Sequence, residues 1–201
     1  VKSSNKLIIS QADLEKARSI VHNLRESGNT QYYINTPGET QKALYATIDD
    51  IPCKALPDKL IITDSLIQPI DFKVTSGSLQ NWKYVARKFR YDIQASFYTR
   101  MLQEVYPFHT ILPFIFTVAS SYIDVKPYVY KCSEFDILTG GKGFSRIRHI
   151  KSQLHSISEE HIYGYEYAFE IYKKMKELNI TDTFDVNGYY NNRTETLNLW
   201  L

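Results

Sequence analysis

The chain has 201 residues, with 24 Lys and Arg against 22 Asp and Glu, which gives a formal net charge of +2. A hydrophobic content of 43% with so small a net charge excludes disorder as the dominant state. The length predicts a single domain over residues 1–201. The longest apolar run, Ile111 to Ile123, falls short of the ~18 residues that a transmembrane helix needs, so we expect no membrane association. The near-zero charge argues against non-specific wrapping of nucleic acid, which usually takes a strong basic excess.

Cysteine content and the N-terminus indicate a cytoplasmic protein. Cys53 and Cys132 cannot build a disulfide framework, and the chain has no CxxC pair. The first residues lack the apolar core of a signal peptide. We therefore expect free thiols in a reducing compartment.

The first half of the chain predicts one helix followed by several strands. Ser10 is a candidate N-cap with Asp13 in the first turn, and the helix should end at Gly28-Asn29. Residues 32–35 predict a short strand. Further strands are expected over 41–48, 53–63 and 66–74, with a hairpin turn at Asp49-Asp50. Pro57 would need an edge or a bulge position.

The second half predicts a long helix over 81–106, ended by Pro107, then strands over 110–120 and 128–132. Residues 140–143 predict a loop, residues 150–178 are expected to be mostly helical, and the tail from 179 is rich in turn residues. Consecutive strands between helices indicate an α/β (α+β) fold, with a central mixed sheet flanked by helices.

Two acids and a lysine on neighbouring predicted strands form the main candidate site. Asp58 follows Pro57, and Asp71-Phe72-Lys73 comes thirteen residues later. Strand alternation puts Asp71 and Lys73 on the same side of the sheet. Two carboxylates brought together suit a hard cation such as Mg²⁺, and a neighbouring ammonium can orient the attacking water. The pattern suits metal-assisted phosphodiester hydrolysis; the alternative is a surface salt bridge.

A second pattern lies on the predicted helix after that strand. Tyr91, Gln94 and Tyr98 are spaced i, i+3, i+7 and share one face, and Arg87 lies one turn earlier on that face. Such a face could reach a phosphate backbone. The alternative is a solvated face with incidental tyrosines.

Together these motifs resemble the PD-(D/E)xK nuclease superfamily, within it the RecB-like exonucleases with a Q-x-x-x-Y motif and the phage and prophage exonuclease VIII (RecE-like) domains. The motifs read CKALPD over 53–58, DFKVT over 71–75 and YDIQASFY over 91–98, and the resemblance runs from about Leu14 to the C-terminus. Leu56 stands where the family commonly has arginine. The resemblance implies a restriction-endonuclease-like core.

The resemblance also implies roles for particular residues. Asp58, Asp71 and the Phe72 carbonyl would bind the metal, Lys73 would be the catalytic lysine, and Tyr91, Gln94 and Tyr98 the supporting helix motif. Glu39 best matches the first-motif acid, as a catalytic residue and metal ligand. His22 matches a helix histidine that ligates metal in some relatives; the alternative is an ordinary helical histidine.

A basic segment follows residue 140. Lys142 and Arg146 belong to it, and its glycine-rich start could let the backbone approach phosphate. Contact with a DNA backbone and an ordinary solvated basic face are both open.

These observations predict a Mg²⁺-dependent DNA exonuclease, with Mn²⁺ as an alternative metal. The resemblance implies 5′-to-3′ digestion of double-stranded DNA ends in phage-type recombination or DNA processing. It also implies a ring-shaped homo-oligomer, a single-strand annealing partner, and the cytoplasm of a bacterium or phage-infected host. The alternatives are a restriction- or repair-type endonuclease, and a non-catalytic DNA-binding or phage structural protein on a nuclease fold.

Overall fold

The computed structural model describes residues 9–122, 125–149 and 157–178. These fall into two compact units, one formed by 1–90 and 98–133 and the other by 91–97 and 134–201. Each unit is described by itself. Among the described helices, none combines the length and the apolar character that a membrane span requires.

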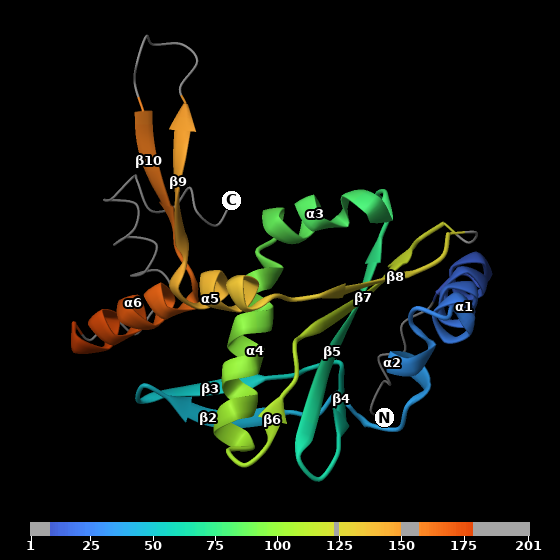
Figure 1. The fold of residues 1–201 in the computed structure, drawn as a ribbon, viewed down its shortest axis with the longest axis horizontal. Coiled ribbons are helices and arrows are strands. Elements are labelled where there is room, and N and C mark those ends of the chain that lie inside the picture. The colour runs from blue at the N-terminus through green and yellow to red at the C-terminus, as the bar shows by residue number, and fades with distance from the viewer. Residues whose placement is uncertain (1–8, 123–124, 150–156, 179–201) are drawn as a thin grey trace, which may run out of the picture. The chain divides into compact units, whose positions relative to one another are not determined.

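The first unit is built on a mixed sheet (Figure 1). Its strand order is β1-β4-β5-β7-β8, with β6 also pairing with β5. The β5 pairings with β6 and β7 are parallel, whereas β4 pairs antiparallel with β5, and β8 with β7. A helical crossover joins β5 to β7, as parallel strands require. The strands are β1 (Glu39–Thr40), β4 (Lys59–Ile62), β5 (Leu66–Thr75), β6 (Thr110–Ile111), β7 (Ile115–Ser120) and β8 (Tyr128–Lys131).

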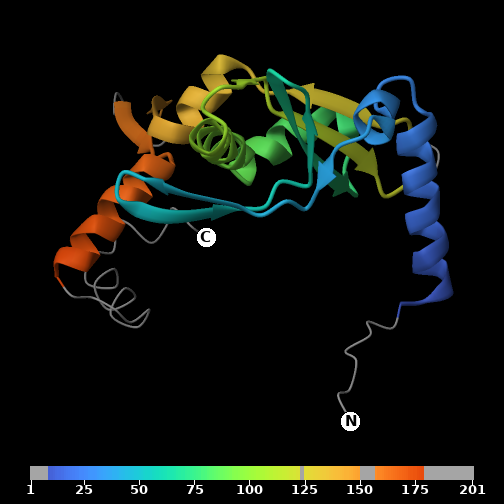
Figure 2. The same cartoon turned by 90° about the horizontal axis from the view of Figure 1, so that it is seen from below.

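A separate hairpin, β2 (Leu44–Ile48) and β3 (Ile51–Ala55), leaves this sheet (Figures 1 and 2). Its turn at Asp49-Asp50 is confirmed, and both residues have positive φ, as tight hairpin turns with strand-matched twist require. The predicted strand 53–63 is wrong as one element, because the chain leaves β3 at Leu56 and enters β4 at Lys59. Pro57 lies in this break, where its missing N–H costs no ladder hydrogen bond.

Helices cover both faces of the sheet. The helix from Ser10 is confirmed as α1 (Gln11–Glu26), with the Ser10 side chain accepting a hydrogen bond from the Asp13 N–H at 3.1 Å. The predicted strand 32–35 is wrong, because α2 (Gln31–Asn35) forms there instead. Thr30 starts it, buried, and donates its hydroxyl proton to the Leu24 carbonyl at 2.6 Å. The short helix is thereby fastened to the end of α1.

The predicted helix over 81–106 is also wrong as one element. A 3₁₀ turn, η1 (Leu79–Asn81), leads into α3 (Trp82–Lys88), and α4 (Tyr91–Val105) begins after a break. Arg90 has left-handed backbone angles (φ 52°, ψ 48°), which an α-helix cannot contain. The strand expected over 110–120 divides into β6 and β7 around Pro113, which has no N–H for a ladder.

The second unit contains the start of α4 together with α5 (Glu134–Lys142), β9 (Phe144–His149), β10 (Ile157–Ile162) and α6 (Tyr165–Glu177). Residues 140–142 are helical instead of the predicted loop. Glycine is needed there, since a Cβ at Gly140 would lie 2.1 Å from the Asp92 carbonyl oxygen. The Phe97 ring packs on Tyr165 at 5.5 Å and Phe169 at 6.2 Å. Of the helix expected over 150–178, 157–162 is strand β10, and 150–156 and the tail from 179 lie outside the described residues.

Candidate active site

Strand β5 carries three of the predicted site residues through the middle of the sheet. It is bordered by β4 on one side and by β6 and β7 on the other, and Ile67 and Ile70 are fully buried. Phe72 packs against the cluster of Ile61, Ile70 and Ile115 on the face covered by α2. Strand alternation therefore puts Asp71 and Lys73 together on the opposite face, as the sequence predicted.

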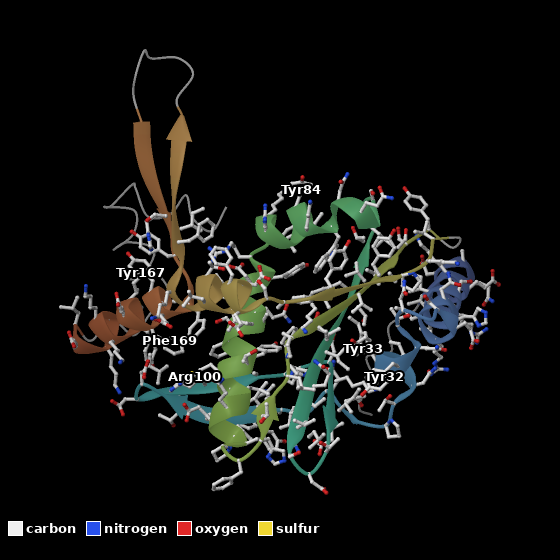
Figure 3. The ribbon with its side chains drawn as sticks, in the orientation of Figure 1. Tyr32, Tyr33, Tyr84, Arg100, Tyr167 and Phe169 are labelled. Carbon is white, nitrogen blue, oxygen red and sulfur yellow. The ribbon has the colours of Figure 1, made fainter. Side chains whose placement is uncertain are left out.

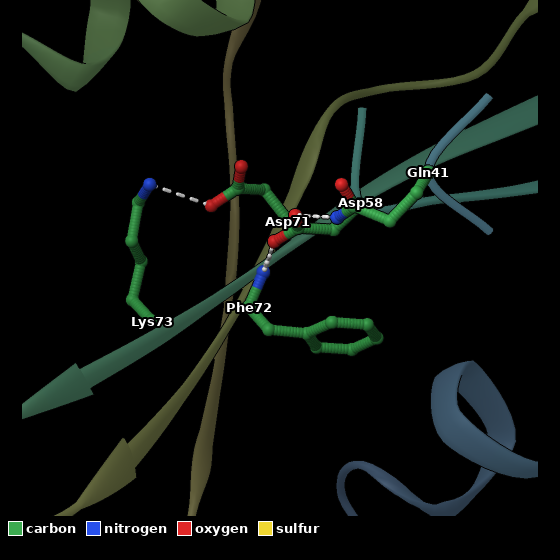
Figure 4. A network of polar contacts seen from close by, with 5 residues as sticks. All are labelled: Gln41, Asp58, Asp71, Phe72 and Lys73. Carbon is green, nitrogen blue, oxygen red and sulfur yellow. Dashed lines mark hydrogen bonds and ion pairs between the residues drawn. The ribbon is translucent and has the colours of Figure 1, made fainter. Parts of the chain in front are cut away.

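Asp58 is placed beside Asp71 by strand register. The β4–β5 ladder pairs Lys59 with Ile70, so the next residues along the two strands, Asp58 and Asp71, are cross-strand neighbours. The Asp58 Oδ2 atom accepts a hydrogen bond from the Phe72 N–H at 2.9 Å (Figure 4). This bond fixes Asp58 directly against the Asp71-Phe72 peptide.

Lys73 and Asp71 form an ion pair. The Lys73 Nζ lies 2.7 Å from the Asp71 Oδ2, the Asp71 residue is only 3% exposed, and the Lys73 side chain is 21% exposed. A buried carboxylate needs such a partner, because desolvation of an unpaired charge is costly. The same ammonium lies 5.8 Å from the centre of the Phe116 ring. Lys73 is thus partly accessible to solvent, whereas the acid that it pairs with is buried.

Gln41 is a member of this group that sequence reasoning missed. The β1–β4 register pairs Thr40 with Lys59, which brings Gln41 opposite Asp58. Its Nε2 donates to the Asp58 Oδ1 at 2.7 Å, and its backbone N–H donates to the Asp58 carbonyl at 3.0 Å. Gln41 also has a positive φ of 51°, which is uncommon for a residue other than glycine. Gln41, Asp58 and Asp71 therefore form one row across three strands.

The donor set of this row fits a hard divalent cation. Both acids offer carboxylate oxygens, the ligands that Mg²⁺ prefers, and each oxygen of Asp58 has a second lone pair besides the one used by Gln41 or Phe72. In the part of the chain that the structure describes, no three His, Cys, Asp or Glu side chains come together at one metal position. A bound ion would accordingly need backbone or water oxygens as well.

Glu39 and His22 are not brought into such a group with Asp58 and Asp71. Glu39 lies on β1 opposite Leu60, and its side chain is about half exposed and 2.5 Å from Lys42. The hydrogen bond to Glu39 is the main reason that the pKa of Lys42 is raised. His22 is exposed on α1, in a shallow hollow that Arg18 and Arg25 also line. Their roles as metal ligands stay predictions.

The three motif residues on α4 lie on one continuous helix, as predicted. Tyr98 belongs to the first unit, where its ring centre is 6.2 Å from that of Phe114. Tyr91 and Gln94 belong to the second unit, and both are half-buried. Arg87 does not continue their face, because the break at Arg90 separates α3 from α4.

The two basic residues predicted after residue 140 both lie in the second unit. Lys142 is the last residue of α5 and is exposed. Arg146 lies on β9, with its backbone opposite Glu160 of β10. The Arg146 side chain lies outside the described part of the structure.

Comparison with known proteins supports the fold reading. A crystal structure described as a "putative exonuclease" from Eubacterium rectale aligns with a TM-score of 0.50 and 15% sequence identity. The alignment covers 64% of this chain and 48% of that one, so the chain spans about half the length of this neighbour. No curated protein matches the sequence.

The sequence profile of a family described as "PDDEXK-like domain of unknown function (DUF3799)" matches residues 2–137. The match includes Asp58, Asp71 and Lys73 and extends over more than half of the chain. The mixed sheet with helices on both faces is the restriction-endonuclease-like arrangement expected for that superfamily. The chain therefore belongs to the PDDEXK-like domain family.

Proposed function

We propose that the domain is a metal-dependent deoxyribonuclease that hydrolyses phosphodiester bonds. The observation that carries the proposal is the meeting of Asp58, Asp71 and Lys73 on one face of the sheet, within a PDDEXK-like fold. Two acids with a lysine beside them can hold a cation and a phosphate oxygen in one place. A bound divalent ion would supply Lewis-acid polarisation of the phosphate and activation of water.

The residues of the chain would do the positioning. Asp58, held by Gln41 and by the Phe72 N–H, would present a fixed carboxylate to the ion. Asp71 would present the second, and the Phe72 carbonyl a third oxygen. Lys73 would orient the water and stabilise negative charge developing on the phosphate. The water oxygen would bond to phosphorus as solvent takes up its proton, the bond from phosphorus to the 3′-oxygen would break, and solvent would protonate the departing oxygen.

We further propose Mg²⁺, with Mn²⁺ as a substitute, and exonuclease action from the 5′ end of double-stranded DNA. The RecE-like motif order supports this finer reading, together with the ring-shaped homo-oligomer, the annealing partner and the role in phage-type recombination. DNA contacts would come from Arg87, Tyr91, Gln94, Tyr98, Lys142 and Arg146. Glu39 and His22 would need to move or act through water to reach the ion.

Digestion of matched DNA substrates tests the proposal. Closed circular and linear duplexes, labelled at the 5′ or 3′ end of the linear form, are incubated with Mg²⁺, with Mn²⁺ and with EDTA. We expect the linear DNA to be degraded and the closed circle to stay intact. Degradation should require metal and should release the 5′ label early. Cutting of the closed circle would show an endonuclease instead. No cleavage with either metal would favour a non-catalytic DNA-binding protein.

A further inference from the structure

The outer face of α3, formed by Lys83, Tyr84, Arg87 and Lys88, is basic. The stretch from residue 72 to residue 91 contains five Lys or Arg and no acid, in a chain whose total charge is only +2. Lys83, Arg87 and Lys88 form no ion pair within the described part of the chain. The positive charge here is therefore not neutralised by neighbouring side chains.

The orientation of α3 follows from its inner residues. Trp82 is 3% exposed, and its ring lies 5.4 Å from Phe116 and 4.7 Å from Tyr130. Val85 and Ala86 are half-buried beside it. At 100° per residue, the four residues of the outer face lie between 100° and 240° from Trp82, and all four are exposed.

Tyr84 occupies the middle of this basic surface. It is 58% exposed and points away from the sheet in Figure 3. The Lys83 ammonium lies 5.2 Å from the centre of its ring. At the end of the helix, Phe89 is 60% exposed and has the Lys88 ammonium 5.7 Å from its ring centre. Exposed aromatic rings set among cations are the combination that binds unpaired nucleic acid, with bases stacked and phosphates neutralised.

Helix α3 lies on the same face of the sheet as the candidate active site. Phe116 contacts Trp82 of α3, and the Lys73 ammonium lies 5.8 Å from the same Phe116 ring. A strand bound to α3 would therefore lie on the face of the sheet that carries Lys73 and Asp71. Duplex DNA offers its bases only at its end, whereas an unpaired strand can stack a base on Tyr84.

We propose that the outer face of α3 binds an unpaired DNA strand next to the catalytic residues, with Tyr84 stacking on a base and Lys83, Arg87 and Lys88 contacting phosphates. The inference deepens the nuclease proposal and rests on it for the identity of the polymer. It assigns α3 the task of holding a single-stranded segment of the substrate.

Equilibrium binding in EDTA tests this without cleavage. Fluorescence anisotropy is measured with a labelled oligothymidylate and with a blunt hairpin duplex, over a series of salt concentrations. Tyr84→Ser should weaken oligothymidylate binding by roughly tenfold or more, and Tyr84→Phe should retain it. The combined variant Lys83→Gln, Arg87→Gln and Lys88→Gln should lower the salt slope for the single strand by about 2.

Matched controls come from the same unit. Tyr45→Ser removes another exposed tyrosine that has a lysine ammonium, that of Lys54, 5.5 Å from its ring. A control triple, Lys16→Gln, Arg18→Gln and Arg25→Gln, removes the same charge from three exposed positions of α1. Both controls should bind oligothymidylate nearly as the wild type does.

Three results would overturn the inference: wild-type affinity in Tyr84→Ser, an unchanged salt slope in the α3 triple, or equal losses for single strand and duplex. Because no metal is present, a protein that fails to cleave can still pass this test. A protein that cleaves can likewise fail it, so the two proposals fall separately.

Discussion

Replacing Gln41 separates its effect on the backbone from its effect on Asp58. Its left-handed backbone costs about 1–2 kcal/mol for a residue other than glycine, and Gln41→Gly removes that cost. The change also loses the 2.7 Å hydrogen bond to Asp58, worth about 1 kcal/mol at an exposed site. Glycine also lowers the stability by about 0.5–1 kcal/mol, because it loses more conformational freedom on folding than other residues do. These contributions nearly cancel, so the free energy of unfolding should change by less than about 1 kcal/mol.

Metal affinity should respond quite differently. Without the amide, the Phe72 N–H is the one hydrogen-bond donor to the Asp58 carboxylate that remains among the described residues. Loss of such a supporting contact typically weakens metal binding by about 10–100-fold. Mn²⁺ affinity is measured by isothermal titration or by electron paramagnetic resonance, and stability by urea denaturation. The control is Gln68→Ala, which removes a different glutamine hydrogen bond of the sheet, 2.6 Å from the Gln68 amide on β5 to the Pro113 carbonyl. Unchanged Mn²⁺ affinity in Gln41→Gly, or a loss matched by Gln68→Ala, would refute the positioning role.

Three further predictions concern packing and titration. Gly140→Ala should unfold the second unit at a markedly lower temperature, because the added Cβ would lie 2.1 Å from the Asp92 carbonyl oxygen. Gly28→Ala is the control, because its Cβ would meet open space and should not change the melting temperature. Equal melting temperatures for the two variants would contradict this packing. Burial lowers the pKa of Lys59 below its ordinary value of 10.5, so the unfolded chain holds the proton more tightly. The wild type should therefore gain stability relative to Lys59→Met as the pH rises toward 10.5, and parallel pH profiles from urea denaturation would count against it. Burial also raises the pKa of the Cys53 thiol, so iodoacetamide should alkylate Cys53 more slowly at pH 8 than it alkylates a free cysteine peptide. Mass spectrometry of the Cys53 peptide measures the rate, and faster alkylation would be inconsistent with the burial.

Local patterns in the sequence were sufficient for much of the site. Alternation along β5 predicted that Asp71 and Lys73 share a face, and the structure has them in an ion pair at 2.7 Å. The N-cap at Ser10 and the turn at Asp49-Asp50 were equally local, because each depends on a few adjacent residues.

The sequence predictions were wrong or incomplete where contacts between distant parts of the chain determine the local structure. The left-handed turn at Arg90 interrupts a helix whose apolar periodicity continues through it, so periodicity could not reveal it. Gly140 is helical because it packs against α4, a contact that local propensity does not report. The position of Gln41 opposite Asp58 depends on the register between β1 and β4, which is defined only in the folded sheet. Pro57 and Pro113, in contrast, already indicated in the sequence that the strands predicted over 53–63 and 110–120 were too long.

The central claim, that Asp58, Asp71 and Lys73 together hydrolyse DNA, is tested most directly by the Mg²⁺-dependent cleavage rate of Lys73→Met. Lys54→Met, which removes an exposed lysine of the same unit, is the matched control. We expect Lys73→Met to cleave linear duplex DNA at least about 100-fold more slowly, and Lys54→Met to cleave it at the wild-type rate. A Lys73→Met protein that remains folded and cleaves as fast as the wild type would contradict a catalytic role for Lys73.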